Sequence, residues 1–176
     1  MRPLIPRVAA IHDLSGFGRS SLCNVLPILS TMGIQACPVP TAVLSTHSGG
    51  FDGYTFRDLT EDIPGFIRHW KELGLEFDGI YSGFLGSPRQ VELVRELIHT
   101  FRTPKTWVVI DPVMGDGCVE KSAGVAEQFR IICERQGVHF VDAKDCEFNK
   151  VDFMHLTRKG HAQLAELLAA KVPELI

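Results

Sequence analysis

Residues 8–39 read VAAIHDLSGFGRSSLCNVLPILSTMGIQACPV, and this stretch decides the fold class. It opens with the short apolar run Val8–Ile11, which predicts a strand, and ends with Ile34–Val39, which predicts a second strand. Between them, Ser20–Met32 carries apolar residues at the spacing of an amphipathic helix. Gly33 follows directly, where glycine commonly caps the C-terminus of a helix. A strand, a helix and a second strand in this order predict a βαβ unit with parallel strands.

The same alternation continues along the rest of the chain. Further strands are predicted at Gly79–Tyr81, Trp107–Ile110 and Val138–Val141. Further helices are predicted at Asp62–Leu73, Pro88–Phe101, Ser122–Gln136 and Arg158–Lys171. Residues Thr41–Asp58 form a long polar and glycine-rich connection without a clear period. The pattern predicts an α/β fold, a three-layer, doubly wound parallel sheet of five strands in the flavodoxin-like order 2-1-3-4-5.

Length and composition narrow the class of protein. The 176 residues, 45% of them hydrophobic, predict a single domain over residues 1–176. A net charge of −3 argues against partners that need a basic surface, namely nucleic acid and anionic membrane. The sequence contains neither an apolar run of about 18 residues nor a signal-peptide pattern. Five scattered cysteines without a C-x-x-C pair favour free thiols, so we expect a cytoplasmic protein.

Ligands of doubly wound sheets bind beyond the carboxyl ends of the strands, so the segments that follow the predicted strands are the candidate site. Four of them are unusual, and they are HDLSGFG at 12–18, STHSGGF at 45–51, SGFLG at 82–86 and DPVMGDG at 111–117. The first opens a predicted helix with glycines, which suits an anion held by backbone N–H groups, but a tight turn explains it equally well. It lacks the lysine and the third glycine of the common phosphate-binding loops.

Each of the other three segments also has two interpretations. His47 is either a loop histidine with satisfied hydrogen bonds or a ligand contact, and Phe84 is either a core residue or a flat wall for an aromatic ring. Asp111 caps a helix, or together with Asp116 it holds Mg²⁺ near phosphates.

The segments HDLSGFGR, TAVLSTHSGGF, FDGIYSGFLGS and VVIDPVMGDG, in this order, resemble the pyridoxal/pyridoxamine kinase branch of the ribokinase-like superfamily. The resemblance runs from about Val8 to Gly117 and implies a binding site for a pyridoxal-like small molecule. The implied ring site has His12 and Ser15 beside the pyridine ring and Phe84 stacked on it. The implied polar contacts of the substrate are His47 and Ser48. The implied neighbours of the metal and the nucleotide phosphates are Asp111 and Asp116.

The remainder of the chain departs from that family. Kinases of this branch are considerably longer, and their second half grips ATP and carries a G-[TS]-G-D segment whose Asp is the general base. Residues 118–176 contain no such segment. Phosphoryl transfer depends on positioning and on charge stabilisation around the transferred group, so we expect kinase activity to be lost. Mg and ATP therefore belong to the kinase-like parent, and no cofactor is assigned to this chain.

Residues 121–176 resemble a different family. The segments GVHFVDAKD at 137–145 and VDFMHLTRKGHAQLAELLA at 151–169 are similar to the C-terminal end of SGNH (GDSL-type) ester hydrolases. That resemblance implies that Asp152 and His155 supply the acid and base of a Ser-His-Asp triad, with Ser15 as a substitute nucleophile. The G-D-S block and the G-x-N-D oxyanion element of the family are missing. Without the resemblance, Asp152 would be a loop or capping residue and His155 a packing residue.

Together the two resemblances predict a chimera, natural or made in the laboratory. A kinase-like segment 1–118 joins a hydrolase-like segment 119–176. Three functions stay open: weak binding of a pyridoxal-like ring without efficient catalysis, ester hydrolysis, or a structural or interaction role that includes a homodimer.

Overall fold

The computed structural model describes residues 5–112, 124–150 and 155–175. The chain divides into two compact units, Met1–Val113 and Met114–Ile176, which are described separately. The predicted site residues Asp116 and Asp152 lie outside the described residues. No helix in the described ranges is long and apolar enough to span a membrane.

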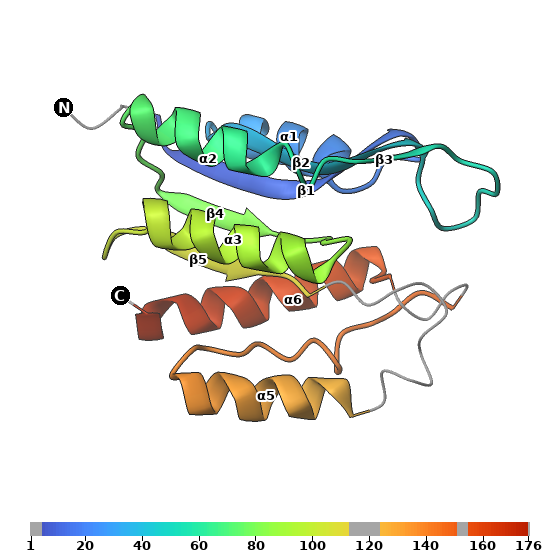
Figure 1. Ribbon diagram of the computed structural model, residues 1–176. Coiled ribbons are helices and arrows are strands. Elements are labelled where there is room, and N and C mark those ends of the chain that lie inside the picture. Colours follow the sequence, from blue (N-terminus) through green and yellow to red (C-terminus); the bar gives the residue numbers. More distant parts are fainter. Residues whose placement is uncertain (1–4, 113–123, 151–154, 176) are drawn as a thin grey trace. The chain divides into compact units, whose positions relative to one another are not determined.

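A five-stranded sheet forms the centre of the first unit (Figure 1). Its strands are β1 (Arg7–Phe17), β2 (Gln35–Thr46), β3 (Phe56–Asp58), β4 (Gly79–Ser82) and β5 (Trp107–Ile110). They lie in the order β3-β2-β1-β4-β5. Strand β1 pairs in parallel with β2 and β4, β4 pairs in parallel with β5, and the short edge strand β3 is antiparallel to β2.

Three helices cover the two faces of this sheet. They are α1 (Leu22–Thr31), α2 (Ile63–Glu72) and α3 (Pro88–Phe101). Figure 1 shows α2 and α3 in front of the sheet and α1 behind it. The crossover through α1 leads from β1 to β2 and the crossover through α2 leads back from β2 to β4, so crossovers of one hand place these helices on opposite faces. The predicted three-layer α/β fold is confirmed for this unit.

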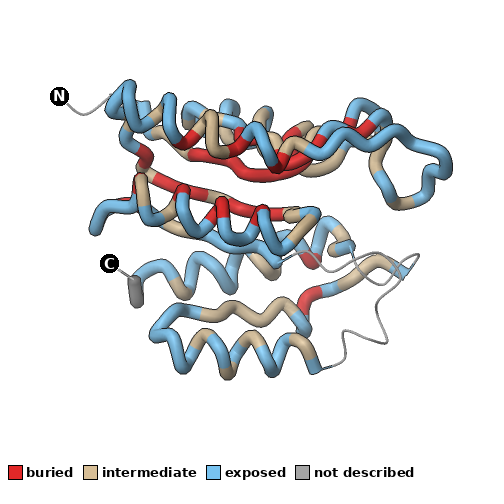
Figure 2. The backbone as a smooth tube through the Cα atoms, in the orientation of Figure 1, coloured by how far each residue is buried: buried red, intermediate tan, exposed pale blue. Residues whose placement is uncertain are grey.

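The core lies between the sheet and the pair α2 and α3, and Figure 2 shows buried residues along the central strands and on the inner sides of these helices. Ala9 and Ile11 alternate along β1 toward this face, as the two-residue period of a strand requires. Trp70 of α2 lies 5.2 Å from Phe77 and 6.4 Å from Phe101, measured between ring centroids. Burial of each large apolar side chain contributes about 1.5–3 kcal/mol, so this face dominates the stability of the unit.

The predicted strand order is wrong at the fifth strand. The four parallel strands follow the predicted order, but residues 138–141 form no strand and the fifth place belongs to β3. Strand β2 continues past Val39 to Thr46, and its end pairs with β3 through Ala42, Val43 and Leu44. Both lie within the stretch that showed no period. A three-residue edge strand has no local signature, because the strand beside it determines the pairing.

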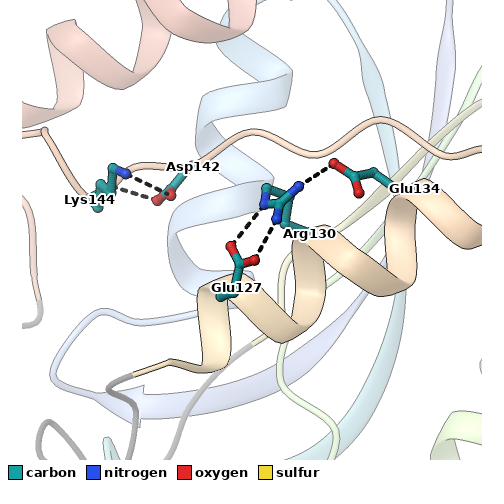
Figure 3. A network of polar contacts seen from close by, with 5 residues as sticks. All are labelled: Glu127, Arg130, Glu134, Asp142 and Lys144. Carbon is teal, nitrogen blue, oxygen red and sulfur yellow. Dashed lines mark hydrogen bonds and ion pairs between the residues drawn. The ribbon is translucent and has the colours of Figure 1, made fainter.

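The described residues of the second unit include α5 (Val125–Gln136), α6 (Arg158–Lys171) and the 3-10 turn η1 (Val172–Leu175). Thr157 caps α6 by accepting a hydrogen bond from the Gly160 backbone N–H at 3.0 Å. Arg130 of α5 is paired with Glu127 and Glu134, and Lys144 lies near Asp142 (Figure 3). These exposed ion pairs follow helical spacing or a turn and indicate a solvated surface.

Candidate functional site at the carboxyl edge of the sheet

The carboxyl ends of β1, β2, β4 and β5 meet at one edge of the sheet, because these four strands are parallel. The residues that the sequence singled out in the first unit lie near the carboxyl ends of these strands or in the segments that follow them. They are His12, Ser15, His47, Ser48, Phe84 and Asp111. His155 belongs to the second unit. The candidate site of the first unit is therefore assembled from four separate strand ends.

Strand β1 is longer than predicted. The segment HDLSGFG at 12–18, predicted to follow the strand, therefore lies mostly within it. The strand continues through His12 and Ser15 to Phe17, with a register shift against β2 between His12 and Leu14. Part of this backbone therefore pairs with β2 instead of forming a free loop. A β-bulge re-aims the side chains beside it, which is common next to binding sites.

Asp13 and Ser15 lie two residues apart on β1, the spacing that puts side chains on the same face of a strand. Ser15 donates its hydroxyl hydrogen bond to Asp13 Oδ2 at 3.2 Å, and both side chains are buried. The Cys23 thiol donates to the Ser15 carbonyl at 2.8 Å. The Ser15 proton is thus held by a carboxylate that the sequence did not select. The sequence analysis missed this pair because it ended the strand at Ile11; the i, i+2 spacing of a longer strand would have indicated it.

His12 is enclosed on both sides at the same edge. Its ring meets the Tyr81 ring edge-on at 4.4 Å, and a Cβ added to Gly83 would lie 2.2 Å from His12 Nδ1. Its Nε2 is buried without a hydrogen-bond partner in the described part of the chain. Burial lowers the pKa of His12, while the charges of Asp111 and Asp13 act in the opposite direction. The imidazole is therefore neutral at neutral pH.

Tyr81 links this histidine to the end of β5. Its hydroxyl donates a hydrogen bond to Asp111 Oδ2 at 3.3 Å. Burial, followed by the nearby charge of Asp111, raises the pKa of Tyr81 to about 12, so the phenol stays protonated and remains a donor. Tyr81 was not selected from the sequence, since only the register of β4 against β1 and β5 brings it here.

The residues at this edge do not fit a metal ion. Among the residues that the structure describes, no group of three or more His, Cys, Asp or Glu side chains is arranged to hold one. Asp111 is hydrogen-bonded to Tyr81, and its predicted partner Asp116 lies outside the described ranges. Mg²⁺ would need several oxygen ligands in near-octahedral geometry, so no chemical step is derived through a metal here.

The segment after β2 contributes His47 and Ser48. The backbone N–H of Gly49 donates to His47 Nδ1 at 3.1 Å, and the backbone N–H of His47 donates to the Phe17 carbonyl at 2.8 Å. His47 Nδ1 also lies 3.2 Å from the Gly49 carbonyl oxygen, so the tautomer of the ring decides whether Nδ1 accepts from the Gly49 N–H or donates to the Gly49 carbonyl. The histidine therefore both organises its own turn and offers a polar group at the edge.

Phe84 follows β4 and is half-buried. Its segment is fixed by Gln90, whose side chain is 1% exposed. Gln90 Nε2 donates to the Thr41 carbonyl at 3.0 Å and to Thr60 Oγ1 at 2.9 Å, and Gln90 Oε1 accepts from the Gly86 N–H at 2.8 Å. Because three segments meet on one buried amide, the loop that carries Phe84 is held firmly against β2.

A hollow lies on the outer surface of α2 and α3, away from the strand ends. Its lining is charged and polar, and it consists of Lys71, Arg89, Glu92, Arg95, Glu96, His99 and Thr100. Arg95 and Glu92 are an exposed ion pair at helical spacing. We regard this hollow as ordinary solvated surface.

Comparison with known proteins agrees with the geometry of the first unit. No protein-family model matches the chain. A pyridoxal kinase of Burkholderia orbicola is 29% identical over 128 residues, which cover 66% of this chain and 42% of the kinase. The chain is therefore similar to the pyridoxal kinases. It spans about 42% of the length of this curated relative.

Two solved structures extend the similarity to the fold. A protein of Bacteroides thetaiotaomicron described as a phosphomethylpyrimidine kinase, crystallised with pyridoxal, is 53% identical with a TM-score of 0.62. The match covers 64% of this chain and 39% of that protein. The pyridoxal kinase of Lactobacillus plantarum is 30% identical with a TM-score of 0.59, over 64% of this chain and 40% of the kinase. The predicted similarity to ribokinase-like kinases is confirmed, whereas the hydrolase resemblance stays a prediction.

Proposed function

We propose that the first unit binds a pyridoxal-like ring at the carboxyl edge of its sheet. The observation that supports this proposal is that the segments with His47, Ser48 and Phe84 follow the carboxyl ends of parallel strands that flank the β1 bulge, although they lie far apart in the sequence. The similarity to a Bacteroides protein crystallised with pyridoxal supports the same ligand class. In this proposal Phe84 supplies a flat apolar wall for the ring, and the polar groups of the segment after β2 hold its substituents.

We further propose that this chain binds the acceptor ring without transferring phosphate to it efficiently. Phosphoryl transfer requires a nucleotide, a metal and donors around the transferred group. Residues 118–176 contain no G-[TS]-G-D segment, the element that carries the general base in the kinases that this chain resembles. The proposed activity is therefore binding, with an ancestry in the kinases.

Calorimetric titration with pyridoxine tests the proposal, because pyridoxine lacks the aldehyde that would form imines with lysines. We expect binding near the millimolar range, worth about 4 kcal/mol. Phe84→Ala should raise the Kd roughly two- to tenfold, the range for loss of one aromatic contact. Val91→Ala, an exposed substitution on α3, serves as the control and should leave the Kd unchanged. Absence of heat at several millimolar pyridoxine would remove the proposal.

A second function, ester hydrolysis, is favoured by one arrangement in the second unit. The Asn149 N–H donates to the His155 carbonyl at 2.7 Å, and the Thr157 N–H donates to the Glu147 carbonyl at 2.9 Å. Phe148 and Leu156 form an isolated antiparallel bridge between the same segments. The His155 side chain is exposed, as a general base must be accessible.

Hydrolysis of a short-chain p-nitrophenyl ester tests this alternative. His155→Ala should abolish turnover if the Asp-x-x-His element works, while His161→Ala, an exposed histidine on α6, should leave it intact. Equal rates for wild type and His155→Ala would exclude the hydrolase.

We also propose that the chain joins a kinase-like segment to a hydrolase-like segment. The boundary between the compact units at residues 113–114 supports a join close to residues 118–121.

A further inference from the structure

Strand β5 ends the sheet of the first unit with an edge that no other described strand covers. Within residues 5–112, 124–150 and 155–175, β5 pairs with β4 alone. A further strand was predicted at residues 138–141 beside this edge, but those residues form no strand. An open edge presents a row of unpaired N–H and C=O groups, which is a template for another strand.

The hydrogen bonds to β4 show which backbone groups of this edge are free. The N–H groups of Trp107 and Asp111 both donate to carbonyls of residues 78–82, at 2.9 and 2.8 Å. Backbone groups alternate in direction along a strand, so the N–H and C=O of Val108 and the N–H of Ile110 point away from β4. These groups are placed to pair with a strand on the other side.

The side chains of β5 are apolar, and the charges stand at its two ends. Trp107, Val109 and Ile110 are 42%, 49% and 52% exposed, and the strand itself carries no charge. Lys105 precedes the strand and Asp111 follows it, and both are exposed. A second copy of β5, laid antiparallel against the first, brings the positive end of each strand to the negative end of the other. The edge is therefore complementary to itself.

We infer that two copies of this chain associate through β5, with the strands antiparallel about a two-fold axis at Val108. In this pairing the two Val108 residues exchange N–H and C=O hydrogen bonds, and the Ile110 N–H of each copy donates to the Thr106 carbonyl of the other. Trp107 lies opposite Val109, and an aromatic residue beside a β-branched one is a favourable cross-strand pair. The association does not depend on the proposed ring binding.

The charges at the ends of β5 select this register. The axis at Val108 sets Lys105 of each copy opposite Asp111 of the other, because the two positions are equally far from it. An axis at Val109 would also pair the free backbone groups, but it would set the Asp111 carboxylate against Trp107. Opposite charges across a strand pair stabilise it, so the axis lies at Val108.

The association closes at two copies. The opposite edge strand of the sheet, β3, is three residues long and carries Arg57 and Asp58, and short charged edges are poor templates for pairing. One self-complementary patch on each copy gives a closed two-fold pair. The pair also brings Lys105 of the second copy to Asp111, which accepts the Tyr81 hydrogen bond at the candidate site. The second copy thus adds a positive charge at the carboxyl edge of the sheet.

Sedimentation equilibrium of the full chain, from about 10 μM to about 1 mM, tests the pairing. We expect a monomer–dimer equilibrium with a Kd on the order of 0.1 mM, because two four-residue strands form a small interface. Val108→Pro removes an outward N–H and no hydrogen bond to β4, so it should abolish the dimer and leave cooperative urea unfolding of the dilute protein. A dimer of unchanged Kd in Val108→Pro would overturn the inference.

Reversal of the end charges tests the register with exposed substitutions that spare the strand. Lys105→Glu sets two carboxylates against each other and should raise the Kd about three- to tenfold. The double variant Lys105→Glu, Asp111→Lys should restore the wild-type Kd. Lys71→Glu is the matched control, since it makes the same change of charge at an exposed position of α2 and should leave the Kd unchanged.

Three results contradict the inference. A wild-type chain that stays monomeric up to about 1 mM shows that the edge pairs with no second copy. Equal Kd values for Lys105→Glu and Lys71→Glu, or no restoration in the double variant, show that the strands do not meet in this register. Assemblies larger than two copies at the same concentrations show open-ended contact instead of a closed pair.

Discussion

The close approach of Gly83 to His12 makes Gly83→Ala the sharpest test of the structure. A Cβ at position 83 would lie 2.2 Å from His12 Nδ1 and 2.4 Å from Cε1, whereas ordinary contact begins near 3.4 Å. The imidazole is 4% exposed, and the Tyr81 ring stands 4.4 Å away, so the ring has little room to retreat. Gly83 does not have a positive φ, so the cost is steric. Overpacking of this size costs about 1–3 kcal/mol, and we expect the upper half of that range.

Urea denaturation followed by tryptophan fluorescence measures this cost in the first unit alone. Both tryptophans, Trp70 and Trp107, lie in that unit, and Trp70 packs in its core. Gly65→Ala is the matched control, because a Cβ there meets nothing within 4 Å. We expect it to stabilise the unit by about 0.4–1 kcal/mol, the usual gain when alanine replaces a glycine in a compatible conformation.

The double variant His12→Ala, Gly83→Ala separates the clash from other effects. Removal of the imidazole should make the alanine at position 83 cost less than it does in wild type, with a coupling of about 1 kcal/mol or more. If Gly83→Ala unfolds at the same urea concentration as wild type, the enclosed position of His12 is wrong, and with it the account of the β1 edge.

Three further predictions concern other contacts. Gln90→Leu should lower the free energy of unfolding by about 1–3 kcal/mol in the same fluorescence assay, since it removes the hydrogen bonds that join the buried Gln90 amide to Thr41, Thr60 and Gly86. Gly160→Ala places a Cβ 2.1 Å from the Glu147 carbonyl oxygen, so amide hydrogen exchange at Asn149 should speed up, and unchanged protection would contradict this packing. Stability of the first unit should fall as the pH drops below 6.5, because unfolded His12 takes up a proton that its lowered folded pKa resists. A His12→Gln variant with an equally steep fall between pH 7 and pH 5 would show that another group is responsible.

Local signals were sufficient for several elements and insufficient for others. Helix α3 spans Pro88–Phe101 as predicted, because its proline and the Ser87 cap mark the start and its apolar residues keep the helical period. The predicted bounds of β5 and α6 are also confirmed. Strand β1 was predicted too short, because polar residues after Ile11 break the apolar pattern while the hydrogen-bond ladder with β2 continues.

The candidate site was also predicted only in part from local signals. The sequence located the segments at the strand ends, since composition alone distinguishes a polar, glycine-rich strand end from an apolar strand. It did not find Asp13, because the strand was predicted to end before it, or Tyr81, which meets Asp111 only through the register of β4 against β5.

The sequence by itself therefore determined the alternation of strands and helices, the parallel sheet and the segments that face its carboxyl edge, because periodicity, caps and glycines act over a few residues. Only the tertiary structure decided the fifth strand, the enclosure of His12 and the register of β5 against β4. These depend on which segments come side by side across long stretches of chain, and the hydrogen bonds and steric contacts that select them exist only after the sheet has formed.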